Sequence, residues 1–289
     1  MASLKEIKGR IGSVEGTLKI TSAMKMVASA KLHKAQQAIE GMLPYDRQLN
    51  RIMTRLVSGG VDVISPLSME RKKKQRVAVV CVASNSSLCG SYNSNATRHT
   101  VSVLNDYKKE FPAEAIDCYV IGRKLEQSLL KLKGFTLIRD FVGKGDRPSF
   151  DTAKTLADRL MEDFLAGRID EVKLVYMHFK NTASQIPVIE TYLPVPLQTA
   201  KDDGATAGYV VEPSPMEVMK VLIPDALRMK IFTMMLDAQA AEHAARTVAM
   251  QTATDNANDL LDELRILYNK GRQSAITAEL LDIIGGSMH

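Results

Sequence analysis

The C-terminal part of the chain constrains the fold most, because it holds a long stretch without a helix breaker. After Pro224 neither proline nor glycine occurs until Gly271, and apolar residues keep a helical spacing as far as Ile284. At 1.5 Å per residue this stretch predicts a helix roughly 90 Å long. A compact sphere of 289 residues cannot contain such a rod, so the helix needs a partner along its length.

The start of this C-terminal helix is marked in the segment "EPSPMEVM". Ser214 is the expected N-cap, Pro215 takes the first helical position, and Glu217 completes a capping box. Pro224 is expected to break or kink the first turns. The predicted seam is formed by Leu227, Ile231, Met234, Ala238, Ala241, Ala245, Val248 and Thr252 and, after a slip, by Leu260, Leu264 and Leu267.

A second long helix is predicted at the N-terminus. Ser3 and Glu6 form a capping box, and the helix is expected to end by Gly59-Gly60 after roughly 80 Å. Apolar or small residues recur at a spacing of three and four, with one gap near Met24 and Lys25, as in a coiled coil. They are Leu4, Ile7, Ile11, Val14, Leu18, Thr21, Ala28, Leu32, Ala35, Ile39 and Met42.

The two arms differ in charge. Residues 1–58 hold ten Lys or Arg against four Asp or Glu, whereas residues 213–289 hold seven against ten. The basic arm could meet nucleic acid, anionic lipid, an acidic protein surface or the acidic arm of the same chain. We expect the arms to pair with each other and the excess length to enter a partner.

The composition excludes some classes of protein. No run of about 18 apolar residues occurs, so no membrane-spanning helix is expected. The N-terminus has acids and no apolar core, which argues against a signal peptide. Cys81, Cys89 and Cys118 lack metal-type pairing and favour a reducing compartment. No metal or cofactor is expected.

Between the arms the pattern changes to strands alternating with helices. Strands are predicted at 76–84, 116–122, near 135–141, at 171–179 and at 186–195, with helices at 93–110, 123–132 and 151–166. This order indicates a mostly parallel, Rossmann-like sheet with helices on its faces and a final hairpin. A polar loop covers 198–208. The expected division is therefore 1–58, 76–197 and 213–289.

Candidate chemistry is sparse. The loop in "CVASNSSLCGSYN" follows a strand, where α/β proteins bind ligands, and offers Ser87 or Cys89 as a nucleophile. It lacks the glycines and lysine of a phosphate-binding loop. The basic run 71–76 suits a solvated linker better than a contact with an acidic partner. His243 is expected on a helix surface or in a contact with a partner. A solvated face that pairs with Arg265 is expected to hold the carboxylates Asp255, Asp259, Asp262 and Glu263.

Two other classes stay open from the residues alone. One is an α/β enzyme with helical dimerisation arms, which the missing nucleophile–base or phosphate motif disfavours. The other is a coiled-coil nucleic-acid binder, which the charge of the second arm disfavours. We therefore expect no nucleic-acid partner.

Several segments resemble one family. "RQSAITAELLDIIGGS" (272–287) resembles the C-terminal signature of the gamma subunit of F-type ATP synthases, and "KITSAMKMVASAK" (19–31) its N-terminal segment. Segments 242–257 and 210–215 are also similar, in the family's order. The family's usual "SD-RGLCG" loop differs here, because 84–90 lacks its Asp and Arg.

The resemblance implies a non-catalytic rotor subunit without cofactors. Its arms would stand as an antiparallel coiled coil inside a hexamer of alpha and beta subunits. Its α/β domain would form a foot, with an epsilon subunit, on the membrane proteolipid ring. A shaft turning in a sleeve suits shallow Ala, Met and Val side chains, since each buried directional bond would favour one angle. Ion flow through the ring would thus be coupled to ATP synthesis or hydrolysis.

The resemblance also implies contact residues. Those for the alpha and beta subunits are Arg272, Gln273, Thr277, Met24 and Lys25, and those for the proteolipid ring are Tyr209 and Glu212. The implied location is peripheral, on the cytoplasmic face of a bacterial inner membrane. A mature organellar chain on the matrix side is the alternative.

Overall fold

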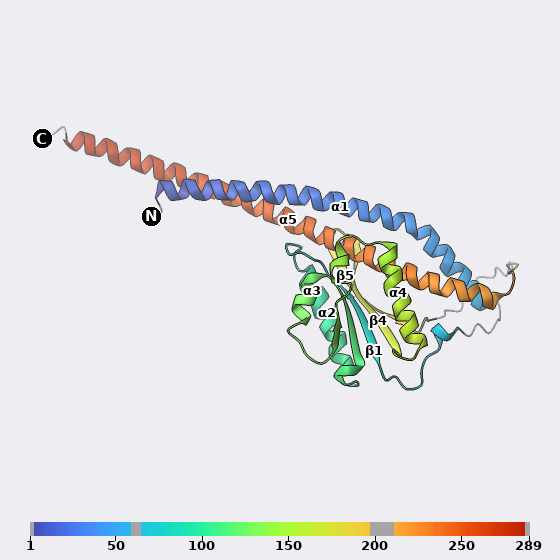
Figure 1. Cartoon of the computed structure of the whole chain (residues 1–289). Helices are drawn as coiled ribbons and strands as arrows, with labels where there is room; N and C mark the ends of the chain where they lie inside the picture. The colour runs from blue at the N-terminus through green and yellow to red at the C-terminus, as the bar shows by residue number, and fades with distance from the viewer. Residues whose placement is uncertain (1–2, 59–64, 197–210, 287–289) are drawn as a thin grey trace.

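The computed structural model describes residues 3–58, 65–196 and 211–286, and it shows an α/β domain from which a two-helix stalk projects (Figure 1). The two ends of the chain make the stalk, as α1 (Leu4–Ser58) and α5 (Pro215–Gly286). The helices are antiparallel, and α5 continues past the start of α1. The predicted fold class, a coiled coil of the terminal helices with a central α/β domain, is confirmed.

A capping box starts α1, as predicted, and the predicted Ser214 cap starts α5. The Ser3 main-chain N donates to Glu6 Oε2 at 2.9 Å, and the Glu6 N donates to Ser3 Oγ at 3.3 Å. In α5 the Glu217 N donates to Ser214 Oγ at 3.3 Å. With 55 and 72 residues, the helices are roughly 80 and 110 Å long.

Pro224 lies inside α5, so the expectation that it breaks the helix is wrong. A proline lacks the N–H that would bond one turn back, which normally weakens a helix. Here Ile223 and Leu227, on either side of the proline, are 1% and 5% exposed in the main core. Packing of these two side chains in the core stabilises the helix where the backbone hydrogen bond of Pro224 is absent.

The sheet has five strands in the order β3-β2-β1-β4-β5. The strands are β1 (Val77–Val82), β2 (Ile116–Ile121), β3 (Thr136–Ile138), β4 (Glu171–Asn181) and β5 (Ser184–Leu193). Neighbours are parallel except β4 and β5, which form the predicted antiparallel hairpin. The mostly parallel sheet is thus confirmed.

Helices cover both faces of the sheet and create two cores. They are α2 (Tyr92–Tyr107), α3 (Arg123–Leu129) and α4 (Phe150–Leu165), with short 3-10 turns η1 (Pro66–Ser68), η2 (Ala113–Ala115) and η3 (Val142–Asp146). In β1, Val77, Val79 and Cys81 face α2 and α3. Ala78 and Val80 face α4 and α5. Burial on both sides explains the unbroken apolar run of this strand.

The predicted seam of α1 is confirmed, with Thr21, Ala28, Leu32 and Ala35 buried against α5. In α5 the prediction is wrong beyond Ala245 except at Leu264. Val248, Thr252, Leu260 and Leu267 are exposed, and the buried positions are Met250, Ala257, Leu261 and Leu264.

The reason is that α5 has two neighbours in its first half. Met234 and Ala238 face the α/β domain, whereas Ala240 and Ala244 pack on Leu32 and the rest of α1. The predicted positions followed the stripe that faces the domain. The stripe that faces α1 continues from Ala244 in steps of three and four to Leu264.

The basic run 71–76 is mostly exposed, as expected for a solvated linker, but three of its cations pair with carboxylates of the domain, which the prediction did not include. Arg71 pairs with Asp170 at 2.8 Å, Lys74 with Glu171 at 2.5 Å, and Arg76 with Asp117 at 3.3 Å. These carboxylates lie at or near the starts of β2 and β4. The run therefore attaches the segment before β1 to the end of the sheet at which β2 and β4 begin.

Candidate functional site

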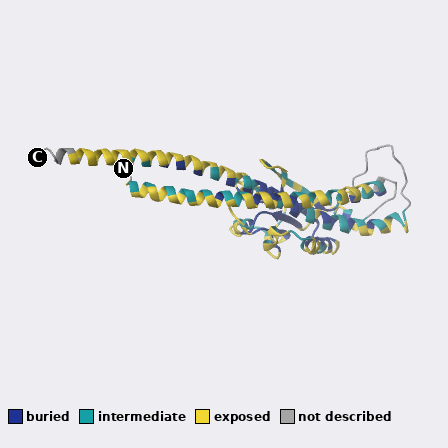
Figure 2. Cartoon of the chain, turned by 90° about the horizontal axis from the view of Figure 1, so that it is seen from above, coloured by how far each residue is buried: buried dark blue, intermediate teal, exposed yellow. Residues whose placement is uncertain are grey.

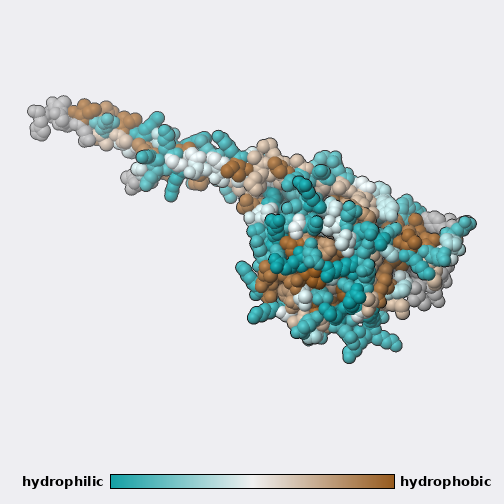
Figure 3. Space-filling view, in the orientation of Figure 1, coloured by the Kyte–Doolittle hydropathy of each residue, from teal (hydrophilic) through white to brown (hydrophobic). Residues whose placement is uncertain are grey.

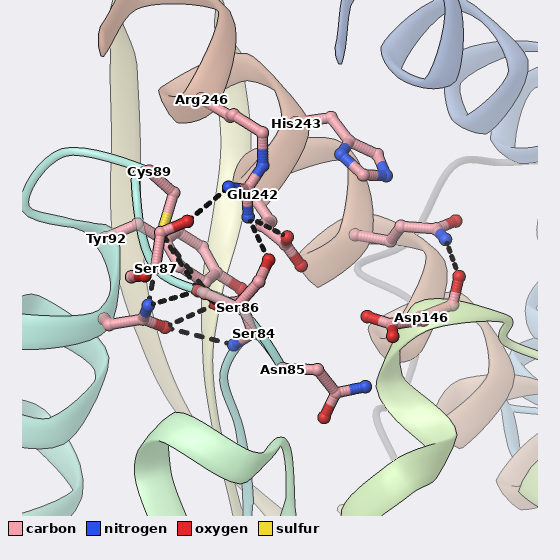
Figure 4. Close-up of polar contacts among 12 residues, drawn as sticks. Ser84, Asn85, Ser86, Ser87, Cys89, Tyr92, Asp146, Glu242, His243 and Arg246 are labelled. Carbon is pink, nitrogen blue, oxygen red and sulfur yellow. Dashed lines mark hydrogen bonds and ion pairs between the residues drawn. The ribbon is translucent and has the colours of Figure 1, made fainter. Parts of the chain in front are cut away.

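The loop after β1 was the main candidate for chemistry, and it packs against α5 (Figure 4). Ser84 is 1% exposed, and its N and Oγ donate to Asn93 Oδ1 at 3.1 and 2.9 Å. The Asn93 side chain also donates to the Ser86 carbonyl at 3.1 Å. The first turn of α2 thus fixes the loop.

Arg246 of α5 holds this loop from the other side. Its guanidinium donates to the Ser87 carbonyl and, at 2.8 Å, to Ser86 Oγ. It also pairs with Glu242 one turn earlier at 2.6 Å, and the two side chains are only 11% and 8% exposed. Burial raises the pKa of Glu242, and the guanidinium opposes that rise. The positive charge that binds the loop therefore belongs to Arg246 of α5, one of the two stalk helices.

Ser87 and Cys89 do not form a nucleophilic site. Cys89 is 1% exposed, and burial raises its pKa, which disfavours the reactive thiolate. No base is bonded to either side chain within the described residues. Across those residues, no group of three His, Cys, Asp or Glu side chains is placed to hold a metal ion. The loop is a structural contact in this geometry.

His243 is buried, which corrects the expectation of a surface position. It is 7% exposed, and its Nδ1 has no hydrogen-bond partner in the described structure. Burial lowers its pKa to about 4, and the cations Lys31 and Arg246 add to this effect. Figure 4 shows its ring pointing away from Cys89 and Ser87. The imidazole is therefore neutral at pH 7 and distant from the Ser87 hydroxyl and the Cys89 thiol.

The predicted carboxylate face is solvated. Asp255, Asp259, Asp262 and Glu263 are all exposed. Arg265 lies 3.6 Å from Asp262 and 3.4 Å from Glu15 of α1. Such exposed pairs contribute about 0–1 kcal/mol each, so this face serves solvation more than stability.

The tip of the stalk carries the predicted contact residues Arg272, Gln273 and Thr277, all exposed. They follow Gly271, which meets Leu4 at the start of α1. Residues 272–286 therefore extend as a single helix, about 22 Å long (Figure 2).

Apolar side chains at this tip remain uncovered. Ile276, Leu280, Leu281 and Ile283 are 49–63% exposed. Figure 3 shows hydrophobic surface near the C-terminal end of the stalk. No helix within the described ranges is long and apolar enough to cross a membrane. An apolar helix surface of this kind is typical of a segment that binds another protein.

The other predicted contact residues are spread along the molecule. Met24 and Lys25 are half-buried in the stalk, where Lys25 Nζ donates to Gln251 Oε1 of α5 at 2.7 Å. Glu212 is exposed just before the Ser214 cap of α5. Tyr209 lies outside the described residues. The fold thus separates Glu212, just before the start of α5, from Arg272, Gln273 and Thr277 near its other end.

Sequence reasoning missed the residues that join the domain to α5. Tyr92 and Tyr192 are buried and donate to α5 carbonyls, those of Ala238 and Leu227. A lone tyrosine in a helix or strand carries no signal of such a bond. The Glu242–Arg246 pair did carry one, because acid and base four residues apart share a helix face.

Fold and site together define a class of protein: a long two-helix shaft on an α/β domain, built for assembly with other chains. The ATP synthase family model matches residues 3–288. An ATP synthase gamma chain of Phocaeicola vulgatus is 55% identical over 291 residues, covering all of both chains. That of Bacteroides fragilis is 52% identical over 292 residues, again covering both completely. The chain belongs to the ATP synthase gamma-chain family.

Solved structures show the same fold. A chain of the Euglena gracilis mitochondrial ATP synthase is 19% identical, with a TM-score of 0.62 over 99% of this chain and 93% of that one. A chain from the central stalk and c-ring of the Tetrahymena thermophila enzyme is 22% identical, with a TM-score of 0.57 over 81% and 99%.

Proposed function

We propose that the chain is the non-catalytic shaft of a rotary ATP synthase. Its stalk turns inside a hexamer of alpha and beta subunits and couples ion flow through the membrane proteolipid ring to ATP synthesis or hydrolysis. The observation that carries this proposal is the single helix 272–286, whose apolar side chains extend beyond the rest of the chain. An axle must protrude in this way to reach its sleeve.

The surface of α1 fits the same role. Ile20, Met26 and Val27 are 55–62% exposed and stand among lysines. Aliphatic side chains have low relief, and lysines exchange partners along an acidic wall at little cost. Rotation of a curved shaft presents a different face to each beta subunit and shifts its open and closed states in turn.

At the other end, the α/β domain would serve as the foot with an epsilon subunit, and Tyr209 and Glu212 would contact the proteolipid ring. The titles of the structural neighbours name a central stalk with c-ring and a rotor. This supports the division into a shaft helix at 1–58, a foot domain at 76–197 and a second shaft helix at 213–289.

The location follows from this assembly. We place the chain as a peripheral subunit on the cytoplasmic face of a bacterial inner membrane. Support comes from the full-length identity to gamma chains of the bacteria Phocaeicola vulgatus and Bacteroides fragilis.

The test replaces Arg272 and Gln273 together by alanine in the assembled complex. We propose that both, with Thr277 nearby, hydrogen-bond loops of the beta subunit, with Met24 and Lys25 contacting the sleeve lower down. The variant should lower ATP turnover several-fold while the circular dichroism of the isolated chain stays unchanged. Arg98→Ala, an exposed arginine of α2, is the matched control. Unchanged turnover of the tip variant would count against the assigned contacts.

A further inference from the structure

The α/β domain is bonded to α5 along a continuous stretch of that helix, from Leu227 to Arg246. Arg228 Nε donates to Asp158 at 2.7 Å, and Lys230 pairs with Glu190 at 2.8 Å. Asp237 accepts from the Phe179 N at 2.9 Å and from His178 at 2.7 Å. Gln239 donates to the Asp146 carbonyl at 2.8 Å. Together with Arg246 and its loop, these bonds reach α5 from β4, β5, α4, η3 and the loop after β1.

Two of the links are buried phenols. Tyr92 Oη donates to the Ala238 carbonyl at 2.9 Å, and Tyr192 Oη donates to the Leu227 carbonyl at 3.0 Å. The rings are 2% and 3% exposed, and burial raises both pKa values, so both remain donors at neutral pH. Because each phenol donates to a main-chain carbonyl of α5, the domain is attached to the backbone of this helix as well as to its side chains.

The connection of α1 to the domain is different. Within the described ranges, no hydrogen bond or ion pair joins residues 3–54 to residues 65–196. Over residues 3–54 the polar links of α1 to other elements go to α5, as from Thr21 to Thr254 and from Lys25 to Gln251. Ile52, Met53 and Leu56 of α1 pack on the domain through apolar side chains. Apolar contacts are non-directional and resist rotation or sliding less than hydrogen bonds do.

From this asymmetry we infer that torque between the α/β domain and the shaft passes through α5, with α1 as a side support. The positioning residues of this link are Tyr92, Tyr192, Arg228, Asp237 and Arg246. The inference rests on the proposed rotary function and adds the load path within the rotor. It requires the domain and α5 to turn as one rigid body even when α1 is no longer joined covalently to the domain.

The first experiment cuts the covalent link between α1 and the domain. A protease site is inserted between Met69, which is 56% exposed, and Glu70, and it is cleaved after assembly with alpha and beta subunits. A bead is attached through Lys131→Cys on the domain, because Lys131 is exposed and the three natural cysteines are buried. The angular variance of the bead at stall should stay unchanged after cleavage.

The second experiment weakens the bonds to α5. The triple variant Tyr92→Phe, Tyr192→Phe and Arg228→Met keeps the side-chain volumes but removes three links, and the variance should widen at least two-fold. Thr21→Val with Thr254→Val, which removes a hydrogen bond between α1 and α5, is the matched control and should not widen it.

Cleavage that widens the variance as much as the triple variant would overturn the inference, as would a triple variant with unchanged variance. If the triple variant does not assemble, the cleaved complex decides alone. A complex that hydrolyses ATP without turning any bead contradicts the rotary function itself, so the two failures are distinguishable.

Discussion

Gly271 of α5 stands against Leu4 of α1, so closely that a β-carbon added to the glycine would lie 3.1 Å from Leu4 Cδ2. This contact is where the two-helix stalk ends and the single helix begins. Glycine inside a helix costs roughly 0.5–1 kcal/mol relative to alanine. The position therefore balances helix propensity against close packing.

Gly271→Ala should raise the free energy of unfolding by about 0.5 kcal/mol, because the atom that must yield is the end of a flexible, half-buried side chain. Urea unfolding of the full chain measures the change. Gly41→Ala in α1, where nothing lies within 4 Å, is the control and should show a similar gain. A loss of stability in Gly271→Ala alone would mean that Leu4 cannot move.

The stalk also contains a hydrogen-bonded pair of threonines. Thr254 Oγ1 donates to Thr21 Oγ1 at 2.9 Å, and Thr21 is 8% exposed. Thr21→Val should cost about 1 kcal/mol, since it leaves the Thr254 hydroxyl unpaired, whereas the double change to valine should cost less than the sum of the single changes. A double-mutant cycle in urea measures the coupling. Strict additivity would contradict a hydrogen bond between the helices.

The helical period predicted the buried residues of α1 and of the first half of α5, but on α5 it could not assign them to a partner, so the predicted stripe fails beyond Ala245. The seam of α1 follows one periodic stripe because α1 packs chiefly on α5. The first half of α5 contacts both α1 and the domain, so Ala238 and Ala244 are buried by different partners and the period alone cannot assign them. His243 was misplaced for the same reason, since it lies in a stretch of α5 that is buried from both sides.

His243 should make stability depend on pH. Its pKa is about 4 in the folded chain and about 6.5 in an unfolded one, so its contribution is complete above pH 6.5 and is lost as pH falls toward 4. The full loss corresponds to about 3 kcal/mol. Lys31 and Arg246 favour the neutral ring, and Asp146 opposes them. The raised pKa of Glu242 acts in the opposite direction on acidification, so comparison with a variant is needed.

The comparison uses His243→Gln, which keeps a polar side chain without a titrating group. Between pH 7 and 5 the native chain should lose about 2 kcal/mol more than the variant. Parallel stability curves for both chains would show that the imidazole does not titrate with a lowered pKa.

Arg246→Met should be strongly destabilising, because it leaves the buried Glu242 carboxylate and the Ser87 carbonyl without their cation. Breaking one side of a buried pair costs about 3–5 kcal/mol. Arg265→Met removes a similar side chain whose guanidinium is 57% exposed, and it should cost about 0.5 kcal/mol. Equal costs for the two variants, measured by urea unfolding, would refute the idea that Arg246 attaches the loop.

The central claim is that this chain turns as an axle, and single-molecule rotation tests it most directly. The alpha and beta subunits are fixed to a surface, and a bead is attached to the α/β domain through Lys131→Cys. With ATP supplied, the bead should rotate in one direction and stop when hydrolysis is inhibited. A bead that stays still while the complex hydrolyses ATP would contradict the account.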